Sequence, residues 1–315
     1  MYVIIGATGR TGSVVTNYLL EQGQSVRVIG RNAERLKPFT NKGADAFAAE
    51  PTDQAALTEA FTGAKAVYVM LQPNYIATSS NFRAHQDRIM DAIIPALEKA
   101  QVKYVVSLSS WGADKSEGTG PVVGLHQLEQ RLNRIADLNV LHLRAGYFME
   151  NTLSQVDTIL TRGTAAGPFS PNVKFPFIAT RDIGLAAGEA LLNLDFQGKQ
   201  VRELHGNQDL TMHEVSVIIG KAIDNTGLAY IQDSKDKTRN DLLELNFSEH
   251  IINLILEVAD AMNSGYIRML KPRSEDNSAP ISFEMFIKEE FLPLYKLKKQ
   301  LHLTNNVIMN SKIIV

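Results

Sequence analysis

The sequence predicts an α/β protein, with a doubly wound parallel sheet in its first half and a smaller α/β domain behind it. Strand-like apolar runs alternate with helix-like periodic segments through the first 145 residues, which is typical of a parallel sheet covered by helices on both faces. The chain opens with a strand, a glycine-rich turn and a helix, in that order. At 315 residues it exceeds the usual size of a single hydrophobic core, so a second, smaller domain is expected.

The glycine-rich turn at residues 6–12 gives the first indication of function. It follows the apolar run at residues 2–5 and precedes an apolar-periodic segment. Glycine permits backbone angles that side chains forbid, and the next helix directs its positive dipole end at the turn, so a nucleotide pyrophosphate is expected there. Gly6 would form the turn, Gly9 would allow the phosphates to approach closely, and Gly12 would allow close packing of helix and strand.

The spacing of these glycines is G-x-x-G-x-x-G, which differs from the G-x-G-x-x-G of the common dinucleotide fingerprint. A purely structural turn is therefore an alternative interpretation. A second strand, expected over residues 25–29, follows at the distance that a β-α-β unit requires. This context favours the nucleotide.

The remaining elements follow from short apolar runs and from capping residues. Strands are expected at residues 44–49, 66–70, 104–108, 140–143 and 201–204. Helices are expected from a Thr52-Asp53 cap to Phe61, over 82–100, 122–136, 183–192 and 251–262, and after Thr211, which has Glu214 three residues later.

These elements suggest a division of the chain. Residues 1–150 would form the nucleotide-binding domain, to which later segments such as 183–220 return. Residues 151–300 would form the smaller substrate or partner domain, in which the polar segment 232–277 covers the carboxyl edge of the sheet. The tail at 301–315 belongs to a stretch from Lys296 that is basic first and apolar last, and is expected as a docked strand or a disordered end.

Composition excludes several classes of function. A formal net charge of −2 gives no electrostatic reason to expect nucleic acid. The absence of cysteine removes disulfides, thiolate zinc sites and cysteine nucleophiles, and the histidines show no metal-ligand spacing, so no metal is expected. No apolar run approaches the ~18 residues of a membrane span, and Met1 leads straight into the first strand without a signal peptide. We therefore expect a cytoplasmic protein.

Arg31 indicates which dinucleotide is bound. The end of the second strand meets the adenine ribose in a dinucleotide fold, where an acidic residue would accept hydrogen bonds from a free 2′-hydroxyl. Here the sequence is Gly30-Arg31-Asn32, and a guanidinium without an acid favours a 2′-phosphate. NADP(H) is therefore expected in preference to NAD(H), with Arg10 as a second contact. The alternative is that Arg31 is a solvated residue that opens a helix.

Together these segments resemble the NmrA-like family of atypical short-chain dehydrogenase/reductases. The resemblance extends to about Lys296 and rests on five stretches in this order: 6–12, 30–32, 105–114, 143–151, and 282–286 ahead of 291–293. It implies a Rossmann domain, a small C-terminal domain, and NADP or NAD bound between them.

The resemblance also implies further cofactor contacts. Leu71, Gln72 and Pro73 match the loop beneath the ribose and pyrophosphate, and Glu50 stands where relatives usually carry an aspartate near the adenine. The residues from Ser107 to Ser109 match the strand end beneath the nicotinamide ribose. The full set of expected cofactor residues is Gly6, Thr8, Gly9, Arg10, Thr11, Gly12, Arg31, Glu50, Leu71, Gln72, Pro73, Ser107, Ser109, His126, Gly146 and Tyr147.

The segment Gly146-Tyr147-Phe148 matches the nicotinamide side of the cleft, and with Asn151 it implies a substrate site. Tyr147 and Phe148 are equally plausible as simple core aromatics. Asn151 is equally plausible as a helix cap.

The usual catalytic pair of this superfamily, a tyrosine with a lysine four residues later, is missing from the helix expected after Val122. The Tyr-x-x-x-Lys at Tyr295 lies in the C-terminal tail and is interpreted as chance. His126 stands at the lysine-like place, with Glu129 three residues later. It would hydrogen-bond the nicotinamide ribose or protonate a reduced substrate. A surface pair of His126 with Glu129 is the structural alternative.

Two functions fit a chain without that pair. The first is an NADPH-dependent reductase of a small acceptor such as a quinone, for which the protein mainly orients the reactants. The acceptor would lie between residues 147–177 and the 232–277 segment. The second is a regulator that senses NADP(H) and acts through a protein partner without turnover. A nucleotide-sugar epimerase or dehydratase is disfavoured because such enzymes use the missing tyrosine and lysine.

Overall fold

The computed structural model describes residues 1–72 and 77–312. Its centre is a seven-stranded sheet in the order β10-β6-β5-β4-β1-β2-β3, and every pair of neighbours is parallel. This confirms the predicted fold class. The strands are β1 (Tyr2–Ile5), β2 (Val26–Gly30), β3 (Asp45–Ala48), β4 (Ala66–Val69), β5 (Tyr104–Ser110), β6 (Asn139–Ala145) and β10 (Lys199–Leu204).

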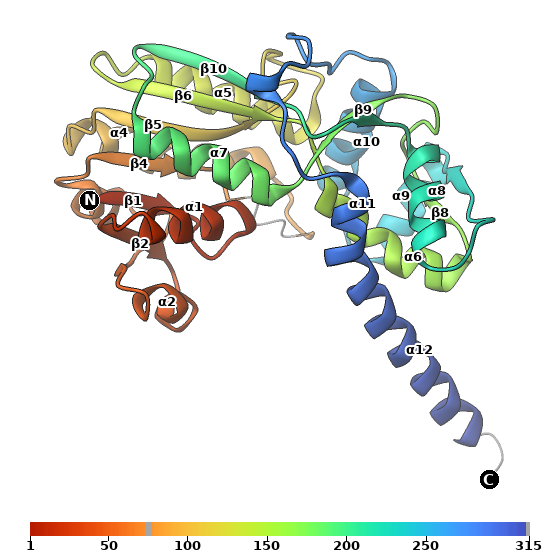
Figure 1. The fold of residues 1–315 in the computed structure, drawn as a ribbon. Helices are drawn as coiled ribbons and strands as arrows, with labels where there is room; N and C mark the ends of the chain where they lie inside the picture. The colour runs from red at the N-terminus through yellow and green to blue at the C-terminus, as the bar shows by residue number, and fades with distance from the viewer. Residues whose placement is uncertain (73–76, 313–315) are drawn as a thin grey trace.

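Helices cover both faces of this sheet because successive residues of a buried strand point to opposite sides. In β1, Tyr2 and Ile4 belong to one core and Val3 and Ile5 to the other. The first face carries α1 (Arg10–Glu21), α2 (Ala33–Thr40) and α7 (Thr180–Asn193), which bury residues in the same core as Tyr2 (Figure 1). The second carries α3 (Gln54–Phe61), α4 (Phe82–Lys99) and α5 (Val123–Asn133), which follows a 3₁₀ turn (Gly120–Val122).

Local sequence sets where several helices begin. Asn32 caps α2 by accepting from the Glu34 N–H at 2.9 Å, and Asp53 caps α3 by accepting from the Ala56 N–H at 3.0 Å. The predicted Thr211 cap is confirmed as a full capping box with Glu214 at the start of α8 (Met212–Ala222). Each cap satisfies amides that the first helical turn leaves without a partner.

The second part of the chain forms a smaller unit around a third core. Its strands are β7 (Tyr147–Phe148), β9 (Phe175–Ile178) and β11 (Asp209–Leu210) in one sheet, and β8 (Ala165–Gly167) with β12 (Tyr230–Gln232) in another. Its other elements are a 3₁₀ helix (Met149–Ser154), α6 (Gln155–Arg162), α8, α9 (Lys235–Glu244), α10 (Glu249–Asn263), a 3₁₀ turn (Glu275–Asn277), α11 (Phe283–Phe286), a π-helical turn (Ile287–Phe291) and α12 (Leu292–Lys312).

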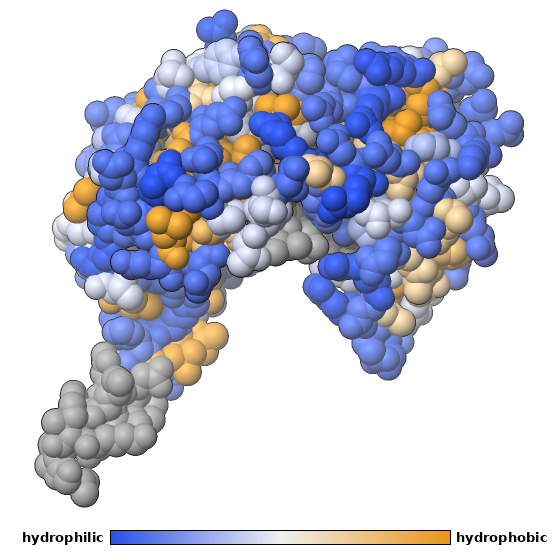
Figure 2. All heavy atoms as spheres, turned by 180° about the vertical axis from the view of Figure 1, so that it is seen from behind, coloured by the Kyte–Doolittle hydropathy of each residue, from blue (hydrophilic) through white to orange (hydrophobic). Residues whose placement is uncertain are grey.

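The chain crosses between these two parts more than once. Both α7 and β10 lie with the main sheet, whereas the following α8 packs in the third core. The segment after α10 passes over the carboxyl edge of the sheet, where the amides of Leu270 and Lys271 bind the Glu203 carboxylate at the end of β10. The strands direct their carboxyl ends toward the smaller part (Figure 1), and the outline of the molecule is hollowed between the two parts (Figure 2).

The C-terminal stretch differs from the expectation. The prediction of a docked strand or a disordered end was wrong for residues 296–312. These residues belong to α12, which continues as one helix to Lys312 and projects from the body of the molecule (Figure 1). Lys298 anchors its first part to Asp157 of α6 at 2.6 Å. The lone Tyr-x-x-x-Lys, Tyr295 to Lys299, lies within α12, and the Tyr295 ring stacks on Phe291. In the part of the chain that the structure describes, no helix combines the length and hydrophobicity needed to span a membrane.

Candidate cofactor site

The glycine loop between β1 and α1 has the geometry of a phosphate cradle. Gly6 adopts a φ of +71°, which side chains rarely tolerate, and its carbonyl accepts from the Gly9 N–H at 2.8 Å. A Cβ on Gly12 would lie 2.2 Å from the Gly6 oxygen. Gly9 is the N-cap of α1 and supplies no side-chain cap, so the first-turn amides are available to an anion. The roles expected for Gly6 and Gly12 match this geometry.

The other residues of the loop divide between surface and interior. Arg10 is exposed and Thr8 is half-buried, so both can face a ligand. Thr11 is only 4% exposed, and its hydroxyl accepts a hydrogen bond from Tyr68 at 3.0 Å. Burial raises the pKa of the Tyr68 phenol well above its usual value, which keeps this donor protonated. Because the Thr11 hydroxyl is buried and bonded to Tyr68, Thr11 would contact a phosphate through its backbone N–H.

Arg31 extends from the end of β2 and is exposed. The cap of α2 is supplied by Asn32 and not by Arg31, so the arginine is not needed to open that helix. His85, in the first turn of α4, lies near Arg31. Its pKa is lowered by burial first and then by the charges of Arg88 and Arg31. Its Nε2 is buried without a partner in the described structure. Sequence analysis did not single out His85.

The loop after β4 and the end of β3 complete this side of the cleft. Leu71 is buried and Gln72 is half-buried, while Pro73 lies outside the described residues. Glu50 is exposed two residues beyond β3. Met70 approaches the glycine loop, since its sulfur would lie 2.6 Å from a Cβ on Gly6. The loop after β4 is thereby packed directly against the cradle.

Ser107 and Ser109, on β5, direct their hydroxyls away from solvent and toward α5. The Ser107 hydroxyl lies 2.7 Å from His142 Nδ1, and the other nitrogen of His142 lies 3.0 Å from Asn133 Oδ1. Because that amide oxygen only accepts, His142 Nε2 donates and its Nδ1 accepts from Ser107. Burial lowers the pKa of His142 to about 4, so the ring is neutral near pH 7.

Ser109 forms a hydrogen bond to a buried ion pair between Glu129 of α5 and Arg144 of β6. Ser109 donates to Glu129 at 2.5 Å, and Arg144 donates to both oxygens of the same carboxylate at 2.9 and 2.6 Å. The Glu129 and Arg144 side chains are only 2% and 12% exposed. Burial alone would lower the pKa of Arg144, but the hydrogen bonds and charge of Glu129 raise it. Glu129 therefore belongs to this buried pair and not to a surface pair with His126.

We expect the titration of His142 to be visible in the pH dependence of stability. Its ordinary pKa is 6.5, and in the folded protein it is about 4. As the pH falls from 6.5 to 4 the unfolded chain binds this proton first, so the free energy of unfolding decreases, by about 3 kcal/mol at most. In His142→Gln, the free energy of unfolding should no longer decrease in this way between pH 6.5 and 4. In His213→Gln, a substitution of an exposed histidine, the decrease should remain. Urea unfolding between pH 4 and 8 measures both, and parallel curves for the wild type and His142→Gln would contradict the assignment.

His126 lies on α5, half-buried, and its Nδ1 is 2.9 Å from the Ala113 carbonyl oxygen. A carbonyl can only accept, so Nδ1 carries the hydrogen and Nε2 of the neutral ring carries the lone pair. Ala113 follows the end of β5, where the nicotinamide ribose is expected. The ring is therefore held in one tautomer at the mouth of the predicted site.

Tyr147 connects this region to a pocket in the smaller part. Its ring lies 5.6 Å from Phe169 and 5.2 Å from Phe177, between centroids, in edge-to-face contacts. Phe148 instead packs against the core of the main sheet. Gly146 allows β7 to approach β9, because a Cβ there would lie 2.1 Å from the Pro176 oxygen. Tyr147 is thus both a member of an aromatic cluster and a wall of the pocket.

This pocket, which we call the aromatic pocket, has a volume of about 240 Å³. Asn151 lines it from an exposed position and does not cap the 3₁₀ helix that contains it. Its apolar walls come from β8, α8 and β12, and include Ala166, Val215 and Tyr230. Thr238 places a buried hydroxyl there that has no partner in the described structure.

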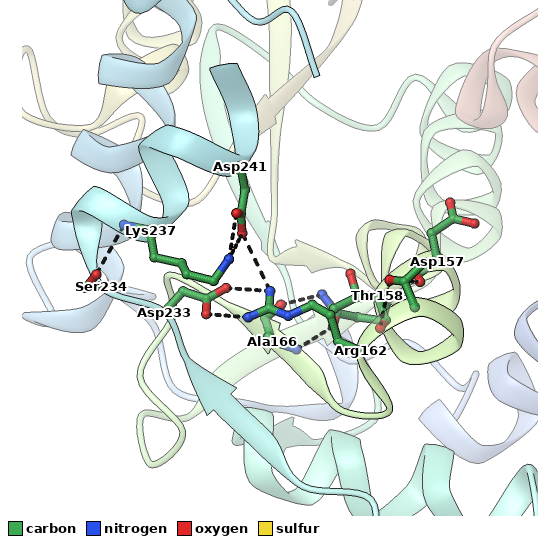
Figure 3. Close-up of polar contacts among 10 residues, drawn as sticks. Asp157, Thr158, Arg162, Ala166, Asp233, Ser234, Lys237 and Asp241 are labelled. Atoms are coloured by element: carbon green, nitrogen blue, oxygen red, sulfur yellow. Dashed lines mark hydrogen bonds and ion pairs between the residues drawn. The ribbon is translucent and has the colours of Figure 1, made fainter. Parts of the chain in front are cut away.

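An ion-pair cluster contributes to the lining of the aromatic pocket. Arg162 of α6 binds Asp233 through two hydrogen bonds of 3.0 and 2.8 Å and lies 3.6 Å from Asp241 of α9 (Figure 3). Lys237 pairs with the same Asp241 at 2.6 Å. Sequence analysis missed this cluster because Arg162 and Asp233 are 71 residues apart and show no common motif.

Comparison with known proteins identifies the family. The model of the NmrA-like family matches residues 2–291. The chain belongs to the NmrA-like family. The predicted resemblance is thereby confirmed over nearly the whole chain.

Individual relatives of this NmrA-like protein are distant. An NAD(P)H azoreductase from Xenophilus azovorans is 24% identical over 270 residues, which cover 84% of this chain and 86% of that protein. The structure of the NADPH-dependent quinone oxidoreductase QOR2 from Escherichia coli, in complex with NADPH, superposes with a TM-score of 0.79 at 19% identity and covers 92% of this chain and 100% of that one. The negative transcriptional regulator NmrA in complex with NADP gives 0.71 at 14% identity, over 94% and 97%.

Among the described residues of this NmrA-like protein, no three histidine, aspartate or glutamate side chains are grouped as metal ligands. The part of the chain around the main sheet contributes the glycine loop, Arg31 and His126, and the smaller part contributes Tyr147, Asn151 and the aromatic pocket. The arrangement can hold a dinucleotide along the carboxyl edge of the sheet and a small apolar molecule beyond Tyr147.

Proposed function

We propose that this protein is an NADPH-dependent reductase of a small planar acceptor such as a quinone. The observation that carries the proposal is the position of the aromatic pocket, which begins at Tyr147, the residue expected beside the nicotinamide. Aromatic walls from Tyr147, Phe169 and Tyr230 suit a flat conjugated ring, and a volume of about 240 Å³ suits a molecule of that size.

The residues present fit the dinucleotide. A Cβ on Gly12 would fill the space beside the Gly6 carbonyl, and the first turn of α1 offers uncapped amides without an acidic neighbour. These features suit a pyrophosphate, and exposed Arg31 with neighbouring His85 suits the 2′-phosphate of NADP(H). Arg10 and Thr8 would contact the phosphates from the rim of the loop.

When bound, the reduced nicotinamide supplies a hydride, and the chain's own residues orient the two rings and exclude water. A quinone that accepts the hydride also takes up one proton, which gives the hydroquinone. His126 keeps its Nδ1–H on the Ala113 carbonyl, so Nε2 of the neutral ring would accept a hydrogen bond from a ribose hydroxyl. Only the protonated imidazolium would carry a hydrogen on Nε2, and that form would give this proton to the hydroquinone anion and return to the neutral ring. Such a reaction needs no tyrosine and lysine pair.

The test is steady-state oxidation of NADPH with a panel of quinones and aldehydes. Thr158→Trp fills the mouth of the aromatic pocket from α6, and Thr161→Trp, on the same helix but outside the pocket, is its matched control. We expect Thr158→Trp to reduce kcat/KM for the quinone at least tenfold, with NADPH affinity unchanged. Turnover that is identical in both variants would contradict this location of the acceptor.

A non-catalytic sensor of NADP(H) that acts through a protein partner is the second candidate. It is favoured by the missing tyrosine and lysine pair and by the likeness to the regulator NmrA in complex with NADP. Tight NADP binding without turnover of any acceptor would support it. A His126→Ala variant separates the two, because only an enzyme loses kcat with it.

The preference for NADPH can be tested at Arg31. Arg31→Ala removes the guanidinium expected at the 2′-phosphate, so we expect NADPH affinity to fall roughly tenfold to a hundredfold while NADH affinity changes little. Arg35→Ala, at an exposed arginine of α2, is the control. Equilibrium titration with both cofactors measures the change, and an unaltered NADPH to NADH ratio would disprove the assignment.

A further inference from the structure

A second pocket is separate from the aromatic pocket. It has a volume of about 300 Å³ and opens between β9, the end of β10 and the segment 265–273 that follows α10. It shares no lining residue with the aromatic pocket, and none of the expected cofactor residues lines it. We call it the basic pocket.

The charge of the basic pocket is strongly one-sided. Four of its lining side chains are cationic, namely Lys174, Arg268, Lys271 and Arg273, and one is a carboxylate, Asp209. Asp209 is already paired with Arg273. The other three cations are exposed and form no ion pair within the described part of the chain. In a protein with a net charge of −2, this concentration of positive charge indicates an anionic ligand.

A buried histidine whose ring forms no hydrogen bond in the described structure lines the same pocket. His205 is 4% exposed, and neither ring nitrogen has a hydrogen-bond partner in the described structure. Its backbone is fixed by bonds to Asn277 and Ala279, so Ser278 lies opposite it. The Ser278 hydroxyl is also buried without a partner. A buried polar group left unsatisfied costs about 1 to 3 kcal/mol, which a ligand in the pocket would recover.

The neutral ring of His205 has one N–H that can donate a hydrogen bond to a ligand. Burial first, and then the charge of Arg273, lowers its pKa, so it is neutral near pH 7 with one N–H and one lone pair. The Lys271 backbone is nearby but outside hydrogen-bonding geometry. An anion placed among the cations would therefore accept a hydrogen bond from an uncharged donor in addition to its ionic contacts.

The floor of the basic pocket is apolar. Trp111 is 6% exposed and meets Phe175 edge-to-face, and Met262 is 3% exposed beside them. A simple inorganic ion would leave this surface unused. We propose that the basic pocket binds a small organic anion, whose acidic group lies between Arg268, Lys271 and His205 and whose ring lies on Trp111. The acidic group is a carboxylate or a phosphate.

Trp111 provides a direct measurement because the chain contains one tryptophan. Its fluorescence is followed in the full-length protein during titration with benzoate, phenyl phosphate and inorganic phosphate at constant ionic strength. We expect a saturable change with the aromatic anions, and weaker binding of inorganic phosphate. The tighter of benzoate and phenyl phosphate identifies the acidic group.

Variants locate the site. Arg268→Gln combined with Lys271→Gln should weaken aromatic-anion binding roughly tenfold or more. Arg134→Gln, at an exposed arginine outside both pockets, should not change it. His205→Phe should weaken binding while the thermal unfolding temperature stays equal or rises, because it removes two unsatisfied nitrogens. NADPH affinity should be unchanged in all of them.

The proposal fails if no anion gives a saturable change up to about 50 mM, or if benzyl alcohol binds as tightly as benzoate. It also fails if the double variant binds benzoate with wild-type affinity. None of these measurements requires turnover, so the result is independent of the proposed reductase activity.

Discussion

Gly9→Asp should abolish useful binding of NADPH, lowering the affinity about a hundredfold or more. The substitution places a carboxylate at the N-cap of α1, where the pyrophosphate is expected, and like charges in such contact cost several kcal/mol. Gly9 has a φ of −85° and a ψ of 171°, which any residue adopts, so the backbone is not strained. Aspartate is also a favoured N-cap, but glycine is nearly as good there, so the free energy of unfolding should be equal or greater by only about 0.3 kcal/mol.

The matched control is Gly9→Asn, which has the same shape and also caps a helix but carries no charge. Both variants place a Cβ 3.1 Å from the Gly6 carbonyl oxygen, so the crowding is identical. Calorimetric titration with NADPH should give a much weaker complex for aspartate than for asparagine. Wild-type affinity in Gly9→Asp would disprove the phosphate cradle, and with it both the reductase and the sensor. An equal loss of NADPH affinity in the two variants would show that steric crowding, and not charge, weakens binding.

Glu129→Ala should destabilise the fold by about 3 to 5 kcal/mol, the largest stability effect that we expect from a single polar substitution here. It removes the carboxylate that accepts two hydrogen bonds from Arg144 and one from Ser109. Arg144 would then be a buried charge without a partner, since its side chain is 12% exposed. Urea unfolding measures the change.

Two controls isolate the cause. Asp87→Ala, on α4, breaks a partly exposed pair with Arg131, which lies on α5 as Glu129 does, and should cost no more than about 1 kcal/mol. Glu129→Ala combined with Arg144→Met removes both charges, and should recover part of the loss because no unpaired charge stays buried. A loss below about 1 kcal/mol in Glu129→Ala would show that the pair is not the buried contact described.

Much of the main sheet was predictable because its signals are local. Each buried parallel strand is a short apolar run, and each cap, such as Asp53 or Thr211, lies within four residues of the amide it satisfies. The glycine loop was predictable for the same reason, since Gly6 and Gly12 act on each other across six residues. The C-terminal stretch was misjudged because its composition, basic and then apolar, does not specify helix or strand.

The site residues also differ in whether a local sequence signal identifies them. Arg31 could be singled out because it directly follows a strand, but its neighbour His85 comes from α4 and was missed. Ser107 and Ser109 were expected beneath the cofactor, and the structure shows that their hydroxyls bond to His142 and Glu129. Strand position alone does not show to which partner a hydroxyl donates.

The amino-acid order alone determined the α/β class, the glycine loop and the resemblance to the NmrA-like family, because each of these depends on short stretches of residues that are close together in the chain. Only the tertiary structure decided which side chains meet across long separations: Arg162 with Asp233, Glu129 with Arg144, and His205 with the cations of the basic pocket. The physical reason is that pockets and buried ion pairs are formed by packing, which joins segments whose separation in sequence carries no periodic signal.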